Sequence, residues 1–303
     1  MTDRSAAALS GLIDIQVNGA GGIDLTESPE SVWRVGEALA GFGVAAFAPT
    51  LVSASFDIVD RALAAVGDGP PAGYTGAIVL GWHIEGPFIN PVRAGAHSPS
   101  SLKAPDRGAA RDWSLANGVR IVTLAPELPG ALDLVGDLVG RGVVVSAGHT
   151  DATQAQARAG FDAGIGMVTH LFNAMRPFDH REPGIVGAAL VDERVSIGLI
   201  VDGVHLDPTT VELVVRAVGP DRVIAVSDAI DALGMPPGRY RLAGRDVDVD
   251  VDAGTARLDD GTLAGCIVPV GDSVANLARF ARIPLDVALR AATVNPSRLL
   301  GLQ

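Results

Sequence analysis

The sequence predicts an α/β protein with a TIM-like (β/α)8 barrel, and three observations support this fold. Eight short apolar segments rich in β-branched residues alternate with Ala- and Leu-rich amphipathic segments, the pattern that builds parallel sheets through strand–helix–strand crossovers. Eight is the number of strands that closes such a barrel. The 303 residues allow one domain of barrel size or two smaller ones. No segment has the length and composition of an interdomain linker, so we expect a single domain over residues 1–303.

The expected strands are short apolar runs, which in chain order are 11–19, 44–52, 77–85, 119–127, 143–149, 166–173, 195–205 and 222–229. Helices are expected between them at 29–41, 56–66, 131–141, 151–163 and 208–218. Several of these helices open with an Asp, Ser or Pro start signal. Two more helices, at 273–282 and 285–300, are expected to close the chain.

One segment departs from this rhythm, because residues 240–263 alternate polar and apolar side chains around two turn signals. We expect a β-hairpin insertion over about 238–264, after the eighth strand. Its alternation places Asp246, Asp248, Asp250 and Asp252 on one strand face. A calcium loop is disfavoured because Ala253 stands where an EF-hand requires Gly, so we expect a solvated strand face.

Charge and composition restrict the partners. The chain has 23 Lys and Arg against 35 Asp and Glu, a formal net charge of −12, and its basic clusters are no longer than a pair, which disfavours nucleic-acid or anionic-membrane binding. No apolar run approaches the roughly 18 to 20 residues that span a bilayer, and the N-terminal segment is too short for a signal peptide. The single cysteine, Cys266, cannot form an internal disulfide. We expect a cytoplasmic protein with no nucleic-acid and no membrane partner.

Metal-binding residue types stand at the ends of several expected strands, where a barrel places its catalytic side chains. Glu85 ends the third strand, His149 the fifth, His170 the sixth, His205 the seventh and Asp228 the eighth. One Glu and two His suffice for a catalytic divalent ion with an open position, so Glu85, His149 and His170 are candidate ligands. Asp228, beside this set, is a candidate for proton transfer.

The remaining histidines have other expected roles. His83 lies one pleat step deeper than Glu85 and is expected to be a hydrogen-bonded core residue. His180, beside Arg181 in a charged loop, is expected to be merely exposed. His97 lies in the loop after the third strand, near the same barrel mouth.

Taken together, these residues resemble the N-acetylglucosamine-6-phosphate deacetylases, a family of the amidohydrolase superfamily of metal-dependent barrels. The resemblance runs from about Gly11 to about Leu300, and its motifs are specific in this order and spacing. They are Gly11-Leu-Ile-Asp-Ile-Gln-Val-Asn-Gly19, His83-Ile-Glu-Gly-Pro-Phe88, Gly95-Ala-His97, Val122-Thr-Leu-Ala-Pro-Glu127, Ser146-Ala-Gly-His149, Thr169-His-Leu-Phe-Asn-Ala-Met175, Arg181-Glu-Pro-Gly184, Asp202-Gly-Val-His205, Ser227-Asp-Ala229 and Gly261-Thr-Leu-Ala-Gly265.

The resemblance implies a metal-dependent hydrolase with one divalent metal ion on Glu85, His149 and His170. Zinc (Zn2+) is the first choice, and Fe2+, Co2+ or Mn2+ suit the same ligands. Asp228 is implied as the base and then the acid. Superfamily members with two metals usually carry His-x-His at the end of strand one, whereas Gln16-Val17-Asn18 is similar to the single-metal branch.

The resemblance also implies how the substrate is bound. The residue matching His97 helps to polarise the acetyl carbonyl, and the one matching His205 contacts the sugar phosphate. Asn173 and Ala174 match a phosphate-holding loop. Arg181 matches an arginine that reaches the phosphate from a neighbouring subunit, which implies a homodimer.

The implied activity is metal-dependent deacetylation of N-acetylglucosamine 6-phosphate to glucosamine 6-phosphate and acetate, a step of amino-sugar catabolism. Two features leave alternatives. Relatives carry a flanking β-sandwich built from both chain ends, which we expect to be missing here, so a non-catalytic sugar-phosphate-binding paralogue is one alternative. The segment 265–269 differs from the pocket-lining stretch of relatives, so a related substrate such as N-acetylgalactosamine 6-phosphate is another.

Overall fold

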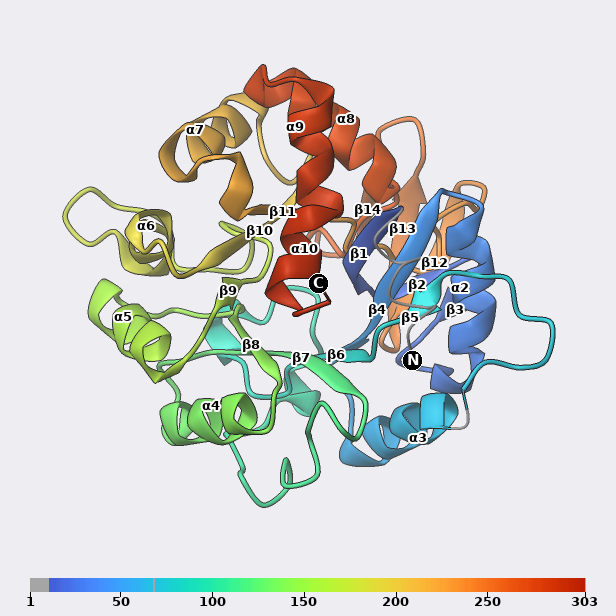
Figure 1. Cartoon of the computed structure of the whole chain (residues 1–303), viewed down its shortest axis with the longest axis horizontal. Coiled ribbons are helices and arrows are strands. Elements are labelled where there is room, and N and C mark those ends of the chain that lie inside the picture. The colour runs from blue at the N-terminus through green and yellow to red at the C-terminus, as the bar shows by residue number, and fades with distance from the viewer. Residues whose placement is uncertain (1–10, 68, 303) are drawn as a thin grey trace.

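The structure, a computed structural model, describes residues 11–67 and 69–302 and contains a barrel of parallel strands (Figure 1). The strand order around it is β1-β4-β6-β7-β8-β9-β10-β11. These strands are β1 (Leu12–Val17), β4 (Val44–Val52), β6 (Trp82–Glu85), β7 (Val119–Leu124), β8 (Val144–Ala147), β9 (Met167–Val168), β10 (Ser196–Ile200) and β11 (Val223–Val226). The barrel closes through backbone hydrogen bonds between the ends of β1 and β11. The Asn18 N–H donates to the Ala229 carbonyl oxygen at 2.7 Å, and the Asp228 N–H donates to the backbone carbonyl oxygen of Gln16 at 3.0 Å. The predicted TIM-like barrel is confirmed.

Helices cover the outside of the barrel (Figure 1). The α-helices that alternate with the strands are α2 (Val32–Ala40), α3 (Phe56–Gly67), α4 (Ala131–Gly140), α5 (Gln154–Ala163), α6 (Gly184–Val191), α7 (Pro208–Val218) and α8 (Val270–Ala281). Short 3-10 helices occur in the connections, namely η1 (Pro29–Ser31), η2 (Pro91–Arg93), η3 (Pro99–Ser101) and η4 (Pro220–Arg222). Only α6 has no counterpart among the expected helices, because its sequence is apolar on every side and shows no helical periodicity. In the described part of the chain, none of the helices has both the length and the hydropathy that a bilayer crossing requires.

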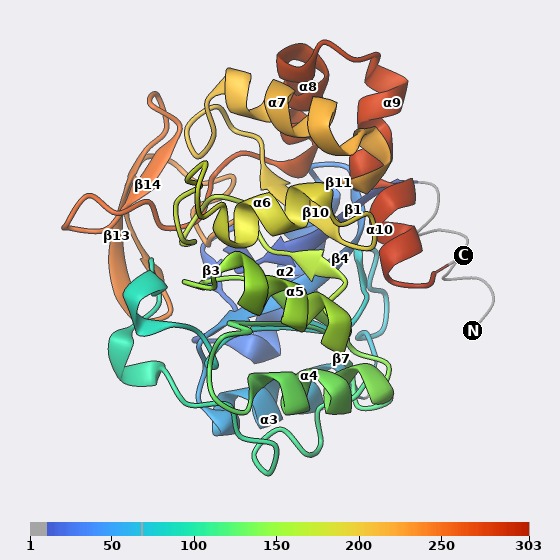
Figure 2. The same ribbon diagram turned by 90° about the vertical axis from the view of Figure 1, so that its left-hand side faces the viewer.

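Two apolar clusters hold the barrel together. The larger one packs the helices against the strands, as with Leu134 of α4 and Val145 of β8. The other joins Ile13, Ile121 and Ile224, which come from three different strands, and so fills the barrel interior. Leu300 belongs to this inner cluster, because the C-terminal segment packs across one end of the barrel (Figure 2).

Three elements are interrupted where the sequence predicts continuous ones. The expected strand 77–85 is divided into β5 (Ile78–Val79) and β6, because Gly81 between them has a left-handed φ of +112°. The expected strand 166–173 is only β9, since His170 has a φ of +30°. The expected helix 285–300 is divided into α9 (Leu285–Leu289), η5 (Arg290–Ala292) and α10 (Val294–Leu299). Pro296 lacks the amide hydrogen that a continuous helix needs and stands in the first turn of α10 instead.

The predicted hairpin insertion is confirmed as an antiparallel sheet of β12 (Gly238–Leu242), β13 (Arg245–Asp250) and β14 (Thr255–Arg257). Val247 and Val249 are buried, while Asp246, Asp248 and Asp250 are exposed, as expected for a solvated strand face. Asp252 is exposed too, but it lies in the turn after β13 and not on the strand. Figure 2 shows this sheet at the end of the barrel opposite α10. A second small hairpin, β2 (Gly19–Ala20) with β3 (Ile23–Asp24), follows β1.

The N-terminus of α5 tests how the sequence sets a helix boundary. The Thr153 hydroxyl accepts a hydrogen bond from the Gln156 amide at 3.3 Å, and the Gln156 side-chain oxygen accepts one from the Thr153 amide at 2.9 Å. Thr153→Ala removes this capping box and is expected to lower the free energy of unfolding by about 1 kcal/mol. Urea unfolding followed by circular dichroism measures the change, with Thr153→Ser as the control that keeps the cap. Equal midpoints for the Ala variant and the parent protein would contradict the expectation.

Candidate active site

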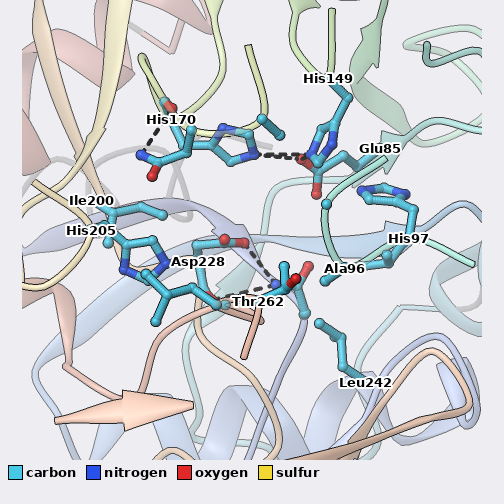
Figure 3. Close-up of a pocket in the computed structure, with 17 residues that line it drawn as sticks. Glu85, Ala96, His97, His149, His170, Ile200, His205, Asp228, Leu242 and Thr262 are labelled. Carbon is cyan, nitrogen blue, oxygen red and sulfur yellow. Dashed lines mark hydrogen bonds and ion pairs between the residues drawn. The ribbon is translucent and has the colours of Figure 1, made fainter. Parts of the chain in front are cut away.

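A cavity of about 310 Å³ lies at the C-terminal ends of the barrel strands, within the size range of small-molecule sites. Its wall combines strand-end residues with residues of the insertion, such as Leu242 of β12 and Thr262 after β14 (Figure 3). The residues selected from the sequence that line it are Glu85, His97, His149, His170, Asn173, Ala174, His205 and Asp228.

The Glu85 carboxylate meets two imidazoles in this cavity (Figure 3). Its Oε1 lies 3.2 Å from Nε2 of His149 and 3.2 Å from Nε2 of His170, and the two nitrogens are 3.1 Å apart. Nitrogen and oxygen ligands bound at about 2.0 Å to a tetrahedral zinc ion lie roughly 3.3 Å from one another. The three side chains therefore fit a single divalent metal ion in both spacing and donor chemistry.

A fourth side chain, His97, lies beside this group. Glu85, His97 and His149 each place one ligand atom within 4.8 Å of the others, and the rings of His97 and His149 are 4.2 Å apart, edge to face. Nδ1 of His97, however, lies 2.6 Å from the Ser53 hydroxyl. The tighter spacing of Glu85, His149 and His170 makes them the better ligand set. Burial holds the pKa of His97 well below its usual value, which favours a neutral imidazole.

A backbone carbonyl orients His149 toward the ligand role. Nδ1 of His149 lies 3.0 Å from the Arg93 carbonyl oxygen. Because a carbonyl can only accept, Nδ1 carries the hydrogen and Nε2 keeps its lone pair for a metal. The Arg93 side chain is held by Asp151 at 2.8 Å, which ties this loop to the segment between β8 and α5. His170 differs, since its buried Nδ1 has no hydrogen-bond partner among the described residues.

Two side-chain amides hold Asp228. Asn18 Nδ2 donates to Oδ1 of Asp228 at 2.8 Å, and Gln16 Nε2 donates to the same oxygen at 3.1 Å and to Oε1 of Glu85 at 3.2 Å. Burial, reinforced by the charge of Glu85, raises the pKa of Asp228 to about 6, a value that suits proton transfer near neutral pH. That Gln16 and Asn18 hold Asp228 was not predicted from the sequence, although two amides within an apolar strand were the available signal.

The candidate residues share a strained backbone conformation. His149, His170 and Asp228 have φ values of +49°, +30° and +52°, and Ser53, after β4, has a φ of +38°. A left-handed conformation costs a residue other than Gly of order 1 kcal/mol and persists where the surroundings enforce it, which is common at functional sites. The barrel strands thus end at the residues that surround the cavity.

His205 stands on the opposite wall from Glu85 (Figure 3). Asp202 fixes its ring. Nδ1 of His205 lies 2.6 Å from Oδ2 of Asp202. Burial alone would raise the pKa of Asp202, but the hydrogen bond and charge of His205 hold it at about 2. Asp202 is therefore ionised at neutral pH and orients the imidazole.

Arg181 is the selected residue that this chain does not place in its own cavity. It is exposed in the loop before α6, where its amide donates to Asp179 at 2.8 Å. Among the described residues, the cavity wall contains neither Lys nor Arg.

The positions of His83, His180 and Cys266 test the remaining expectations about single residues. His83 is buried, with its ring nitrogens 3.0 Å from the Ile15 carbonyl oxygen and 2.7 Å from the Thr123 hydroxyl, which confirms a core role. The His180 side chain is 70% exposed, as expected. Cys266 is buried in the barrel interior, so the altered segment does not bring its thiol to the cavity wall.

A buried carboxylate with two imidazoles at barrel strand ends, next to a buried aspartate, is the arrangement of a metal-dependent hydrolase. Residues 7–303 match the sequence model of the amidohydrolase family, and the chain belongs to this family.

Relatives and solved structures show which members of this family the chain is similar to. The chain is 37% identical to N-acetylglucosamine-6-phosphate deacetylase of Lysinibacillus sphaericus, covering 97% of this chain and 76% of the relative. It is 36% identical to N-acetylgalactosamine-6-phosphate deacetylase of Escherichia coli O157:H7, covering 100% and 80%. A mutant N-acetyl-D-glucosamine-6-phosphate deacetylase from Mycobacterium smegmatis, solved with N-acetyl-D-glucosamine-6-phosphate, superimposes with a TM-score of 0.88 at 37% identity, covering 96% of this chain and 77% of that chain.

Metal content tests which side chains are ligands. We expect the parent protein to bind about one divalent ion per chain, and His170→Ala to lose most of it, because the Ala variant removes one of three ligands. Inductively coupled plasma mass spectrometry after dialysis against dilute zinc measures the stoichiometry.

His180→Ala is the matched control and is expected to keep its metal, since this histidine is exposed and lies outside the cavity. His97→Ala separates the two ligand groups. Loss of metal in His97→Ala with retention in His170→Ala would assign the site to the wider group of Glu85, His97 and His149.

Proposed function

We propose that this chain deacetylates N-acetylglucosamine 6-phosphate, releasing glucosamine 6-phosphate and acetate. The observation that carries the proposal is the meeting of Glu85, His149 and His170 beside Asp228 in one cavity. It is supported by relatives named as deacetylases of this substrate at 36–37% identity over nearly the whole chain. The cavity of about 310 Å³ has the size of a small-molecule site, and polar side chains such as His205 and Asn173 line it.

In this proposal Glu85, His149 and His170 hold one divalent ion. Zinc is the first choice because one carboxylate and two imidazoles leave an open position for catalysis, and Fe2+, Co2+ or Mn2+ accept the same donors. When bound, such an ion polarises the acetyl carbonyl and lowers the pKa of water.

The protein's own residues move the protons and stabilise charge. Asp228 accepts a proton as water adds to the acetyl carbon, and then donates it to the amine nitrogen as the C–N bond breaks. Gln16 and Asn18 hold the Asp228 carboxylate in place for both steps. His97 donates a hydrogen bond to the carbonyl oxygen, where negative charge develops.

In this proposal the sugar phosphate is held by residues of the chain itself and by one residue of a second subunit. His205, oriented by Asp202, and the turn at Asn173 and Ala174 contact the sugar phosphate. Arg181 of a second subunit supplies the guanidinium that the cavity wall of one chain lacks, which makes the active form a homodimer. We place the enzyme in the cytoplasm, with neither nucleic acid nor membrane as a partner; the net charge of −12 and the single cysteine support this.

N-acetylgalactosamine 6-phosphate is the second candidate substrate. It is favoured by the altered segment 265–269 and by the 36% identity to the Escherichia coli deacetylase named for that sugar. Comparing kcat/KM for the two epimers decides between them, because specificity is a difference in transition-state binding.

Acetate release is the first test of the proposed activity. Zinc-loaded protein is expected to hydrolyse N-acetylglucosamine 6-phosphate, and Asp228→Asn to keep its metal while kcat falls by about 100- to 10,000-fold, as for loss of a general acid and base. Acetate is measured by a coupled enzymatic assay, and metal on the same sample.

Three results would count against the proposal. Equal turnover of N-acetylglucosamine without its phosphate would refute the phosphate assignment. Unchanged kcat in Asp228→Asn would remove this residue from the mechanism. Tight binding of the sugar phosphate with no acetate formed, from metal-loaded protein, would identify a non-catalytic paralogue.

Mixed dimers test the position of Arg181. Arg181→Met is expected to lower kcat/KM by roughly 10- to 100-fold through loss of charge-assisted hydrogen bonds to phosphate. If Arg181 acts across the dimer, each mixed dimer of one Arg181→Met chain and one Asp228→Asn chain has one complete site. In an equal mixture that exchanges subunits at random, about half of the dimers are mixed, so about a quarter of the parent activity is expected. Arg111→Met, at an exposed arginine outside the cavity, is the control. No recovery on mixing would show that Arg181 does not act in trans.

A further inference from the structure

Ser53 lies next to the candidate active site and has no role in the proposed function so far. It follows directly after β4, where the register places Val52 opposite Glu85. Its amide donates to the Glu85 carbonyl at 2.7 Å, and the residue is only 3% exposed. Its hydroxyl lies 2.6 Å from Nδ1 of His97.

The Ser53 hydroxyl is enclosed and has one partner. Within residues 11–67 and 69–302, no other group forms a hydrogen bond with this oxygen. Gly86 packs so closely that a Cβ there would stand 2.4 Å from the Ser53 oxygen. The hydroxyl can therefore neither turn to another acceptor nor be replaced by a larger group without movement.

This single partner determines which nitrogen of His97 carries a hydrogen. A neutral imidazole has one N–H donor and one lone-pair acceptor. If Nδ1 donated to Ser53, the hydroxyl hydrogen of Ser53 would be buried without an acceptor, which is unfavourable. The hydroxyl therefore donates to Nδ1, and the only N–H of the ring is at Nε2.

His149 provides the opposite case within the same cavity. Its Nδ1 faces the Arg93 carbonyl oxygen at 3.0 Å, so Nδ1 is the donor and Nε2 keeps its lone pair. The two imidazoles lie edge to face with centroids 4.2 Å apart. A carbonyl partner makes His149 suitable as a ligand, whereas a hydroxyl partner makes His97 suitable as a hydrogen-bond donor.

We propose that Ser53 is a positioning residue that fixes His97 as its Nε2–H tautomer, so that Nε2 donates a hydrogen bond to the substrate's acetyl oxygen as charge develops there. The inference rests on the proposed deacetylase function for its catalytic consequence. The tautomer itself rests only on the hydrogen bonds described above.

The backbone of Ser53 supports this role independently. Its φ of +38° belongs to the same strained group as those of His149, His170 and Asp228, each of which ends a barrel strand at the cavity. Such strain in a residue other than Gly persists where surrounding contacts enforce it. The strain turns the chain after β4 at the point where the Ser53 hydroxyl meets His97.

Two variants remove the hydroxyl with different effects on the backbone. Ser53→Ala keeps the strain at φ +38°, whereas Ser53→Gly relieves it, because Gly adopts a left-handed conformation without penalty. Both variants of the zinc-loaded enzyme are expected to lower kcat by about 10- to 100-fold with little change in KM and metal content, since the donor acts on the transition state. Ser273→Ala, which deletes another buried hydroxyl in α8, is the control and is expected to keep kcat.

A double-mutant cycle shows whether Ser53 acts through His97. In a His97→Asn background, Ser53→Ala is expected to cost less than 2-fold in kcat, because the group it positions is already gone. An equal loss in both backgrounds would overturn the proposal and leave Ser53 a purely structural residue. A kcat within 2-fold of the parent in both Ser53 variants would overturn it as well.

The tautomer is measured without any activity. Nitrogen-15 NMR of imidazole-labelled, zinc-loaded protein, with His97→Asn used to assign the signal, is expected to show the hydrogen of His97 on Nε2 in the parent and a mixture of tautomers in Ser53→Ala. A hydrogen on Nδ1 in the parent would overturn the proposal. If the parent released no acetate from N-acetylglucosamine 6-phosphate, the deacetylase function would fail while this spectrum still decided the tautomer.

Discussion

The Glu85 carboxylate is the constraint on which the rest of the site depends. It is 2% exposed, and burying a carboxylate without a partner for its charge costs several kcal/mol of folding free energy, so it needs partners. Burial alone would raise its pKa, but the imidazoles of His149 and His170 hold the pKa well below its usual range. Gln16 donates to the same carboxylate oxygen and links it to Asp228. Side chains from the segments after β8 and β9 and from β1 thus all contact one oxygen atom of Glu85.

The partner of Nδ1 distinguishes the imidazoles around this cavity. His149 faces a backbone carbonyl, His97 a serine hydroxyl and His205 an ionised carboxylate. The carbonyl and the ionised carboxylate can only accept a hydrogen bond from Nδ1, whereas the hydroxyl can donate one to it. The same residue type can therefore provide a metal ligand, a donor to a carbonyl oxygen and a contact to phosphate.

Much of this arrangement could be predicted from the sequence. The strand count and the rule that barrels place functional groups at strand ends led to Glu85, His149, His170 and Asp228. The helix α6 could not be predicted, because a segment that is apolar all round carries no periodic signal. Ser53 could not be found either, since one serine after an apolar strand is ordinary in composition and its partner is 44 positions away.

The sequence by itself determined the barrel, because hydrophobic periodicity and turn signals are local properties of the chain. It also determined which side chains end the strands. Only the tertiary structure decided the atomic pairings, namely the two amides on Asp228, the hydroxyl on His97, and the absence of Arg181 from the cavity of its own chain. These contacts join distant positions, and the direction of each hydrogen bond depends on which groups burial leaves as the sole partners.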